Sequence, residues 1–329
     1  MQIAFALELH LILFIMKGNL LINLGSPEEL SLQGIKGFLK EFLSDDLVID
    51  APKLVQKTLV SGFIVPLRSN KTLGAYKRIW TPEGSPLIKN TLNLGLGIEE
   101  KTGIPTRVGM RYLQPSIQGA ITDLIESGCN EIRVLPLYPQ YTGSSTVTSI
   151  NKVQSVVEEI SQNLDIKVRY IKSFYDNPSY IDLLSELISS HLPNDLDHLL
   201  FSYHGIPNRQ DKRTDPTYSS QCIETSRLCA EKLNLRSSQW SVSFQSRIGP
   251  GWLKPFTDKA LTKLPKAGKK RLAIISPSFF VDNLETLEEI SIEGRATFME
   301  AGGKEFTYIP CLNGTTAGIK VASRLLDSI

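Results

Sequence analysis

The sequence predicts an α/β protein of two similar lobes, each a parallel sheet flanked by helices. The first indication is that short apolar runs alternate along the chain with longer amphipathic stretches, as in βαβ units. The second is internal likeness: NLLINLGSP at 19–27 is similar to HLLFSYHGIP at 198–207, and EIRVLPLYPQYT at 131–142 is similar to RLAIISPSFFVD at 271–282. Ligands of such folds bind at the carboxyl ends of the strands, so we expect a site between the lobes.

The apolar runs and the amphipathic stretches give the expected elements in order. Runs rich in Ile, Leu, Val and Phe that end in Gly, Pro or Ser are typical of buried strands, and stretches with a helical apolar period lie between them. We expect strands at 19–24, 106–110, 131–137, 166–171, 198–203, 240–244, 271–276 and 306–310. We expect helices at 31–43, 87–100, 116–127, 144–161, 179–191, 219–233 and 284–301.

The turn chemistry of FYDNPS, at 174–179, marks the passage between the lobes. We therefore expect a first lobe at 17–174, with an insertion at about 30–92 that forms a lip over the site. Mixed apolar and basic positions in the insertion would suit a flat anionic ligand, although by composition alone a solvated helical face is the better explanation. A second lobe follows at 175–310, and a C-terminal helix at 311–329 is expected to pack back on the first lobe.

Residues 1–16 form an apolar extension that fits no targeting pattern well. MQIAFALELHLILFI lacks a basic start and a small-residue cleavage site, and it is short for a transmembrane helix. A start of translation at Met16 would remove it, so the extension need not be native. The alternative is a short apolar helix that touches a membrane or the protein itself.

Composition excludes some classes of function. The chain has 329 residues, with 36 basic and 34 acidic side chains, so no basic face for nucleic acid is indicated. The four cysteines form no C-x-x-C pair, which argues against a zinc knuckle or an iron–sulfur site and favours buried thiols in a reducing compartment. A dinucleotide fingerprint, a P-loop and a nucleophile elbow are also absent from the sequence.

A histidine follows an apolar run in the segment SYHGIP. His204 lies between the run at 198–203 and the turn residues Gly205 and Pro207. On this local pattern it is either a turn residue or a functional residue. As a functional residue it could be a metal ligand or a proton carrier, because a neutral imidazole can bind a metal or accept a proton near pH 7.

A row of acids follows the run at 271–276. Asp282, Glu285 and Glu289 stand at i, i+3 and i+7, which would place them on one helix face. Spacing alone favours a capping role for Asp282, but capping does not explain Glu289. Carboxylates together with His204 would suit Fe²⁺, Mn²⁺ or Zn²⁺, or would form a path for protons. The segment TGSSTVTS at 142–149 could hold an anion at a helix N-terminus or serve as a cap, with equal weight.

With these segments together, the chain resembles the ferrochelatases, which insert ferrous iron into a porphyrin. The resemblance runs from about residue 17 to about residue 313. It rests on LLINLGSP, YKRIWTPEGSPL, VGMRYLQPSI, LPLYPQYTGSST, SYHGIP, FQSRIGPGWLKP and ETLEEI in this order. It implies two Rossmann-like lobes around a porphyrin cleft.

The resemblance implies roles for particular residues. His204 and Glu285 match the metal-binding and catalytic pair, and Asp282 and Glu289 match further acids on a secondary path. Arg111, Tyr112 and Trp252 match residues at the porphyrin, and we expect Tyr141 and Phe279 to complete the grip. Asn283 stands where other members have His or Cys, which puts any metal-transfer role of that position in doubt. Only Cys311 lies near the C-terminus, so no iron–sulfur cluster and no prosthetic group are expected.

The expected reaction is insertion of Fe²⁺ into protoporphyrin IX at the end of haem synthesis. Coproporphyrin III as the iron acceptor, another metal such as cobalt, and a two-lobed tetrapyrrole-binding protein without catalysis are the alternatives. The expected protein is a cytoplasmic monomer that takes porphyrin and ferrous iron, binds no nucleic acid, and touches the inner face of the membrane peripherally.

Overall fold

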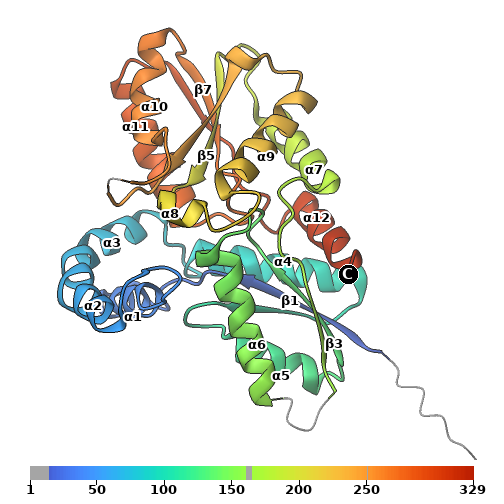
Figure 1. The fold of residues 1–329 in the computed structure, drawn as a ribbon. Helices are drawn as coiled ribbons and strands as arrows, with labels where there is room; N and C mark the ends of the chain where they lie inside the picture. The colour runs from blue at the N-terminus through green and yellow to red at the C-terminus, as the bar shows by residue number, and fades with distance from the viewer. Residues whose placement is uncertain (1–14, 161–164, 250) are drawn as a thin grey trace, which may run out of the picture.

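Two parallel sheets form the centre of the molecule in the computed structural model, which describes residues 15–160, 165–249 and 251–329 (Figure 1). Apart from residues 15 and 16, the apolar extension lies outside the described residues. The strand order is β2-β1-β3-β4 in the first sheet and β6-β5-β7-β8 in the second. This confirms the predicted two-lobed α/β fold. The strands are β1 Lys17–Asn23, β2 Thr106–Met110, β3 Glu131–Pro136, β4 Lys167–Tyr170, β5 His198–His204, β6 Trp240–Gln245, β7 Arg271–Ile275 and β8 Glu305–Tyr308.

The two sheets repeat one another in the way that the sequence likeness predicts. β1 and β5 take the second position in their sheets, and β3 and β7 take the third. All neighbouring strands are parallel, so the carboxyl ends of each sheet meet at one edge.

Alternation along β1 sends side chains to both faces of the first sheet. Leu20 and Ile22 belong to a buried cluster with α5 (Ile117–Glu126) and α6 (Thr148–Ile160), whereas Leu21 belongs to the cluster on the opposite face with α4 (Pro86–Thr102) and α12 (Thr316–Asp327). All three are fully buried, as expected for a parallel sheet that is covered on both sides.

The cluster that contains Leu21 continues into the second lobe. It includes residues of α7 (Pro178–His191), α9 (Tyr218–Lys232) and β5, so the two sheets share one hydrophobic layer. In addition, α12 contacts α4, α7 and β3. The other face of the second sheet is covered by α10 (Thr257–Lys263), η5 (Glu285–Gly294) and α11 (Arg295–Glu300). Residues at the strand ends of both lobes are therefore held in a fixed relation by common packing.

Several of the α-helices begin at polar caps. Ser31, Ser116, Thr217 and Thr315 each accept a hydrogen bond from a backbone N–H in the first turn of the following helix. Within the described residues, no helix is long and apolar enough to cross a membrane. The α-helices are α1 Leu32–Leu43, α2 Lys53–Leu59, α3 Val65–Ile79, α4 Pro86–Thr102, α5 Ile117–Glu126, α6 Thr148–Ile160, α7 Pro178–His191, α8 Asn208–Asp211, α9 Tyr218–Lys232, α10 Thr257–Lys263, α11 Arg295–Glu300 and α12 Thr316–Asp327. The π-helical segments are η1 Val60–Ile64, η2 Gly143–Val147 and η5 Glu285–Gly294, and the short 3₁₀ segments are η3 Ser237–Gln239 and η4 Pro265–Ala267.

Most of the lip insertion projects sideways from the first sheet as α1, α2, η1 and α3 (Figure 1), whereas residues 86–92 begin α4, which packs on that sheet. The insertion has a core of its own, which includes Leu284 of the second lobe as a packed neighbour. Two sets of ion pairs also join the insertion to the second lobe. Asp50 is paired with Arg209 and Arg213, and Arg78 is paired with Glu288 and Glu293.

Arg133 on β3 holds the C-terminal helix against the first lobe. Its side chain is 2% exposed, and the guanidinium donates to the Leu326 carbonyl at the end of α12 and to Asn19 Oδ1 on β1, at 3.1 and 2.7 Å. A cation at a helix C-terminus is also favoured by the helix dipole. The side chain thus satisfies buried acceptors of two elements at once.

We expect Arg133→Gln to lower the free energy of unfolding by about 3 kcal/mol, because the shorter amide leaves these buried acceptors unpaired. Urea denaturation measures the change. Arg324→Gln, which removes an exposed arginine from the same helix, serves as the control and should shift stability by less than about 0.5 kcal/mol. Equal stability of both variants would contradict this role of Arg133.

Candidate functional site

His204 is the last residue of β5, and the glycine after it allows the chain to leave the sheet. The Gly205 N–H donates to the Gln245 carbonyl on β6 at 2.9 Å. A Cβ at position 205 would lie 2.7 Å from that carbonyl oxygen, so a larger residue would push the two strand ends apart. This close approach explains why the SYHGIP segment places glycine directly after the histidine.

The surroundings of His204 keep its imidazole neutral. Its backbone N–H donates to Ser278 Oγ at 3.0 Å, and the Tyr218 hydroxyl donates to its carbonyl at 2.9 Å. The Phe279 ring meets the imidazole edge-on, with 6.1 Å between the ring centres. Burial lowers the pKa of His204 to about 4, so the side chain is free to accept a proton or to bind a metal at pH 7.

Glu285 and Glu289 lie on η5 and are fixed by the end of β6. The Gln245 side chain donates through Nε2 to the Glu285 carbonyl at 3.0 Å. The Ser246 N–H donates to Glu289 Oε1 at 2.7 Å, and the Ser246 hydroxyl donates to Oε2. Because Gln245 also pairs with His204 in the β5–β6 ladder, the histidine and both glutamates are arranged around one strand end.

A π-helix carries the two glutamates. Such segments are rare and often occur at functional sites, because their wider turns re-aim side chains. Glu285 and Glu289 are four residues apart, about one turn, and therefore share a face. The first lobe has a shorter π-helical segment, η2, at the matching place after β3.

Burial makes the carboxyl of Glu285 a weak acid. Burial and the nearby Glu289 carboxylate raise its pKa to about 7, while its own backbone N–H and Arg68 of the lip insertion act in the opposite direction. Burial also raises the pKa of Glu289, against the hydrogen bonds from Ser246. Near neutral pH, Glu285 thus exchanges between a form that can hold a cation and one that can donate a proton.

Asp282 takes a different position from the one that its spacing predicts. The sequence suggested a capping pair with Glu285 and a shared helix face with Glu285 and Glu289, but Asp282 precedes the helix. The cap is formed instead by Asn283, whose Oδ1 accepts from the Thr286 N–H while Thr286 Oγ1 accepts from the Asn283 N–H. Asp282 accepts from Tyr308, Thr286, the Cys311 N–H and Asn313. These bonds occupy its carboxylate within the fold.

Trp252 lies beside His204. Its backbone forms a bridge with Pro207, and its ring carbon Cε3 is 3.4 Å from the position that a Cβ of Gly205 would occupy. Together with Phe279, it places two aromatic rings next to the histidine. Three of the residues expected at the site therefore occupy one neighbourhood.

Arg111 and Tyr112 form a second cluster with Asp45. The Arg111 guanidinium and the Tyr112 hydroxyl both bond to Asp45 Oδ2, as does Thr148 Oγ1. Burial acts to raise the pKa of Asp45, but the bonds from Thr148, the Leu47 N–H and Tyr112, with the charge of Arg111, lower it overall. Arg111 and Asp45 border an open hollow of about 380 Å³.

Tyr141 bonds to the second lobe through its backbone. Its N–H donates to Gln221 Oε1 on α9 at 2.7 Å, which joins the loop after β3 to the second lobe. In the following segment, Thr142 makes no side-chain cap bond, and its hydroxyl instead lies 2.7 Å from that of Ser145. Thr142 therefore does not cap this segment, and the anion-binding role stays a prediction.

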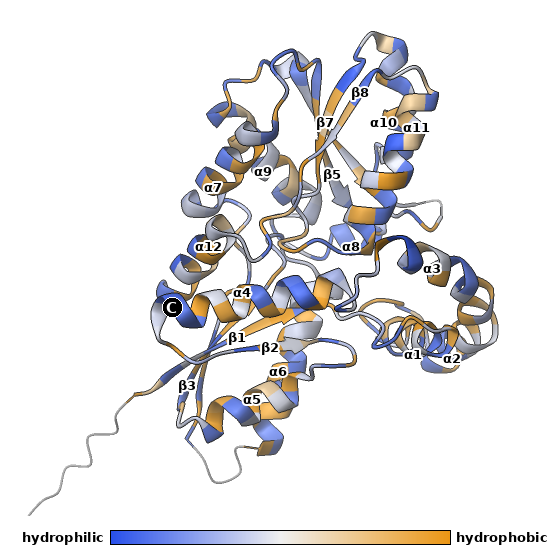
Figure 2. Cartoon of the chain, turned by 180° about the vertical axis from the view of Figure 1, so that it is seen from behind, coloured by the Kyte–Doolittle hydropathy of each residue, from blue (hydrophilic) through white to orange (hydrophobic). Residues whose placement is uncertain are grey.

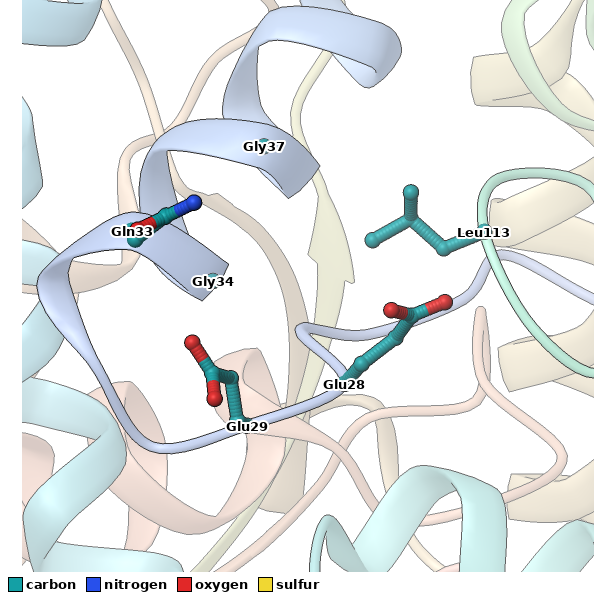
Figure 3. A pocket seen from close by; sticks show the side chains of 6 residues that line it. All are labelled: Glu28, Glu29, Gln33, Gly34, Gly37 and Leu113. Carbon is teal, nitrogen blue, oxygen red and sulfur yellow. The ribbon is translucent and has the colours of Figure 1, made fainter.

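A smaller hollow of about 200 Å³ lies beside the start of α1, and two carboxylates point along its wall (Figure 3). None of the residues predicted for the site lines it. Among the described residues, no group of three or more His, Cys, Asp or Glu side chains is arranged to hold a metal ion. The hollow is lined by Glu28, Glu29, Gln33, Gly34, Gly37 and Leu113.

Sequence reasoning missed the residues that organise the site. The sequence showed Gln245 and Ser246 only as the first residues of a loop. No sequence pattern indicates that a glutamine side chain will bond to β5, to the residue after β7 and to η5. Tyr76 was also missed. It is buried on α3, and burial together with the charge of Glu285 raises its pKa, which places it close to that carboxyl.

Comparison with known proteins agrees with this geometry. The chain matches the family model Ferrochelatase over residues 16–328. The coproporphyrin III ferrochelatase of Streptococcus mutans is 40% identical over 317 residues, covering 94% of this chain and 97% of that protein. The ferrochelatase of Vibrio vulnificus is 38% identical over 313 residues, with the same coverage of 94% and 97%. SirB from Bacillus subtilis, solved with Fe³⁺, has a TM-score of 0.60 at 9% identity over 95% of both chains, which shows a shared fold.

We expect Asp282→Ala to lower the free energy of unfolding by about 3 kcal/mol, because four donors lose their acceptor. Glu289→Gln is the matched control. It keeps an acceptor for the Ser246 N–H and removes a buried charge, so its effect should stay below about 1 kcal/mol. Chemical denaturation of both variants gives the comparison, and an Asp282→Ala protein as stable as the unmodified chain would refute the structural role.

Proposed function

The chain belongs to the ferrochelatase family of metal chelatases, and on this premise we propose that it inserts Fe²⁺ into protoporphyrin IX and releases two protons. The observation that carries the proposal is the pairing of a neutral, buried His204 with the helix that bears Glu285. His204 is unprotonated at neutral pH, so its lone pair is available to a metal ion or to a proton in transit, and the carboxylate form of Glu285 can hold a cation there. These are the two tasks that metallation of a porphyrin requires.

The chemistry follows from what the macrocycle must lose. Two pyrrole N–H groups give up protons, and the metal ion gives up water, as four nitrogens replace its hydration shell. A neutral His204 is the base for the pyrrole protons, or the first ligand of the iron. Glu285 orients the histidine, ligates the iron, or does both. Glu289, one turn further along, extends the acidic path along which the metal enters or protons leave.

The aromatic residues are proposed to hold the macrocycle. Trp252 and Phe279 lie next to His204, where a porphyrin face could stack on them. We propose that Arg111, Tyr112 and Tyr141 contact the substrate from the first lobe. A grip that favours a bent ring would turn a nitrogen lone pair toward the metal and lower the barrier.

Two porphyrins compete as the iron acceptor. Protoporphyrin IX has two carboxylates and coproporphyrin III has four, so the former is the more apolar substrate. We favour protoporphyrin IX on the overall resemblance of the chain to the ferrochelatases. The relative from Streptococcus mutans is named for coproporphyrin III, and this favours the second candidate. The third candidate function is that of a tetrapyrrole-binding protein without catalysis.

We further propose a cytoplasmic monomer in peripheral contact with the inner face of the membrane. Its partners are the porphyrin and ferrous iron, and nucleic acid is not among them, because basic and acidic residues are almost equal in number, 36 and 34.

We expect His204→Ala and Glu285→Gln each to reduce iron insertion by about a hundredfold or more, since each removes a group that acts on the reacting atoms. Anaerobic assays with Fe²⁺ and either porphyrin, followed by the porphyrin absorption bands, measure the rate and name the substrate. His191→Ala, at the end of α7, is the control histidine and should retain activity. Tight porphyrin binding without iron insertion would favour the tetrapyrrole-binding protein without catalysis. Normal rates of iron insertion in both variants would refute the roles proposed for His204 and Glu285.

The pKa of Glu285, about 7, predicts that iron insertion rises with pH through neutrality as its carboxylate form increases. Arg68 lowers this pKa, so Arg68→Gln should move the rise to higher pH. Lys71→Gln, on the same helix, is the matched control and should leave the profile in place. A shift to lower pH in Arg68→Gln, or equal profiles for both variants, would exclude Arg68 as a neighbour that tunes Glu285.

A further inference from the structure

Arg78, near the end of α3, joins the lip insertion to the π-helix that carries the two glutamates of the site. Its guanidinium is paired with Glu288 and with Glu293, the latter at 3.0 Å. Figure 2 shows α3 between the rest of the insertion and the second lobe, with hydrophilic positions along its length. Within the described part of the chain, no other Lys or Arg forms an ion pair with η5.

Three sides of η5 are held by three different contacts. Glu285 and Glu289 share the side that the end of β6 fixes through Gln245 and Ser246. Ile290 is buried in the core of the second lobe. The side chain of Glu288 is only 7% exposed, and its cation comes from the insertion. The second lobe thus fixes two sides of η5, and the first lobe fixes the third.

A buried carboxylate such as Glu288 depends strongly on its counter-ion. Removal of one partner from a buried ion pair leaves the other charge uncompensated, which is costly. Without Arg78, η5 would rotate about its axis until Glu288 reached water. Because Glu285 and Glu289 lie on the same helical segment, this rotation would move both of them away from the end of β6.

We propose that Arg78 is a positioning residue for iron insertion. Its pairs with Glu288 and Glu293 hold η5 in the rotation at which Glu285 stands at the end of β6. Arg78 acts through η5 and does not touch the reacting atoms. Its role in the reaction rests on the proposed function, whereas its effect on η5 can be measured without any substrate.

Hydrogen–deuterium exchange of the full chain, without porphyrin or iron, tests the effect on η5. In Arg78→Gln, the amides of peptides that cover residues 284–294 should exchange at least about tenfold faster. Asp50→Asn is the matched control. It breaks the other ion pairs between the insertion and the second lobe, those with Arg209 and Arg213, and does not touch η5. Exchange of η5 in this control should stay within about twofold of the unmodified chain.

The double variant Arg78→Gln/Glu288→Gln tests whether the buried charge is the cause. It removes the charge together with its partner, so exchange of η5 should return to within about threefold of the unmodified chain. If Arg78→Gln does not fold, Arg78→Lys takes its place. Lysine keeps the charge but lacks the planar fork, and η5 should then exchange about threefold faster than in the unmodified chain.

Anaerobic iron insertion shows whether the position of η5 matters for the reaction. In Arg78→Gln, kcat should fall about tenfold or more, because a small misplacement of a group at the reacting atoms is enough to slow the step. The KM for porphyrin should stay within about twofold, since Trp252 and Phe279 are unchanged. The double variant should recover most of kcat, and Asp50→Asn should keep it within about twofold.

Equal exchange of η5 in Arg78→Gln and the unmodified chain would overturn the proposal. A double variant that exchanges as fast as Arg78→Gln would also overturn it, because the buried charge would not be the cause. If the unmodified chain inserts no iron while Arg78→Gln loosens η5, the proposed function fails and the hold of Arg78 on η5 stands.

Discussion

The buried amide of Gln245 is the interaction on which the candidate site depends. Its Oε1 accepts from Ser202 on β5 and from Ser276 after β7, and its Nε2 donates to the Glu285 carbonyl. The single acceptor oxygen of the amide is shared by a hydroxyl from β5 and a hydroxyl from the residue after β7. The ends of both strands are therefore tied to the start of η5, which the amide nitrogen contacts. A buried donor or acceptor left without a partner costs more free energy than a single hydrogen bond contributes to stability. The three elements therefore keep the arrangement in which all these groups are paired.

Burial of this strand end also sets the pKa values of the site residues. Removing water disfavours charge, so the pKa of His204 falls to about 4 while that of Glu285 rises to about 7. A base that stays neutral and an acid that titrates near pH 7 can then stand at one strand end. The lip insertion contributes to this balance, because Arg68 lowers the pKa that burial has raised.

Much of the fold was predictable, because buried parallel strands leave a clear sequence signal. The run at 106–110 coincides with β2, and the SYHGIP exit was found from its glycine and proline. The sequence patterns missed α2, α3, α8 and α10. In the insertion both faces of the helix are apolar, so no single stripe appears, and α8 has only four residues. Asp282 was misplaced because a carboxylate near a helix start resembles a cap, whereas its donors Tyr308 and Asn313 are distant in sequence. Gln245 has no local signal at all.

We propose that His204 and Glu285 bind one metal ion together because Gln245 joins their elements. A crystal structure of the chain soaked anaerobically with ferrous iron would show whether they do. We expect iron bound by an imidazole nitrogen of His204 and a carboxylate oxygen of Glu285, with the Gln245 amide still bonded to the Glu285 carbonyl. Iron held at the Glu28 and Glu29 hollow instead, with His204 unliganded, would contradict it.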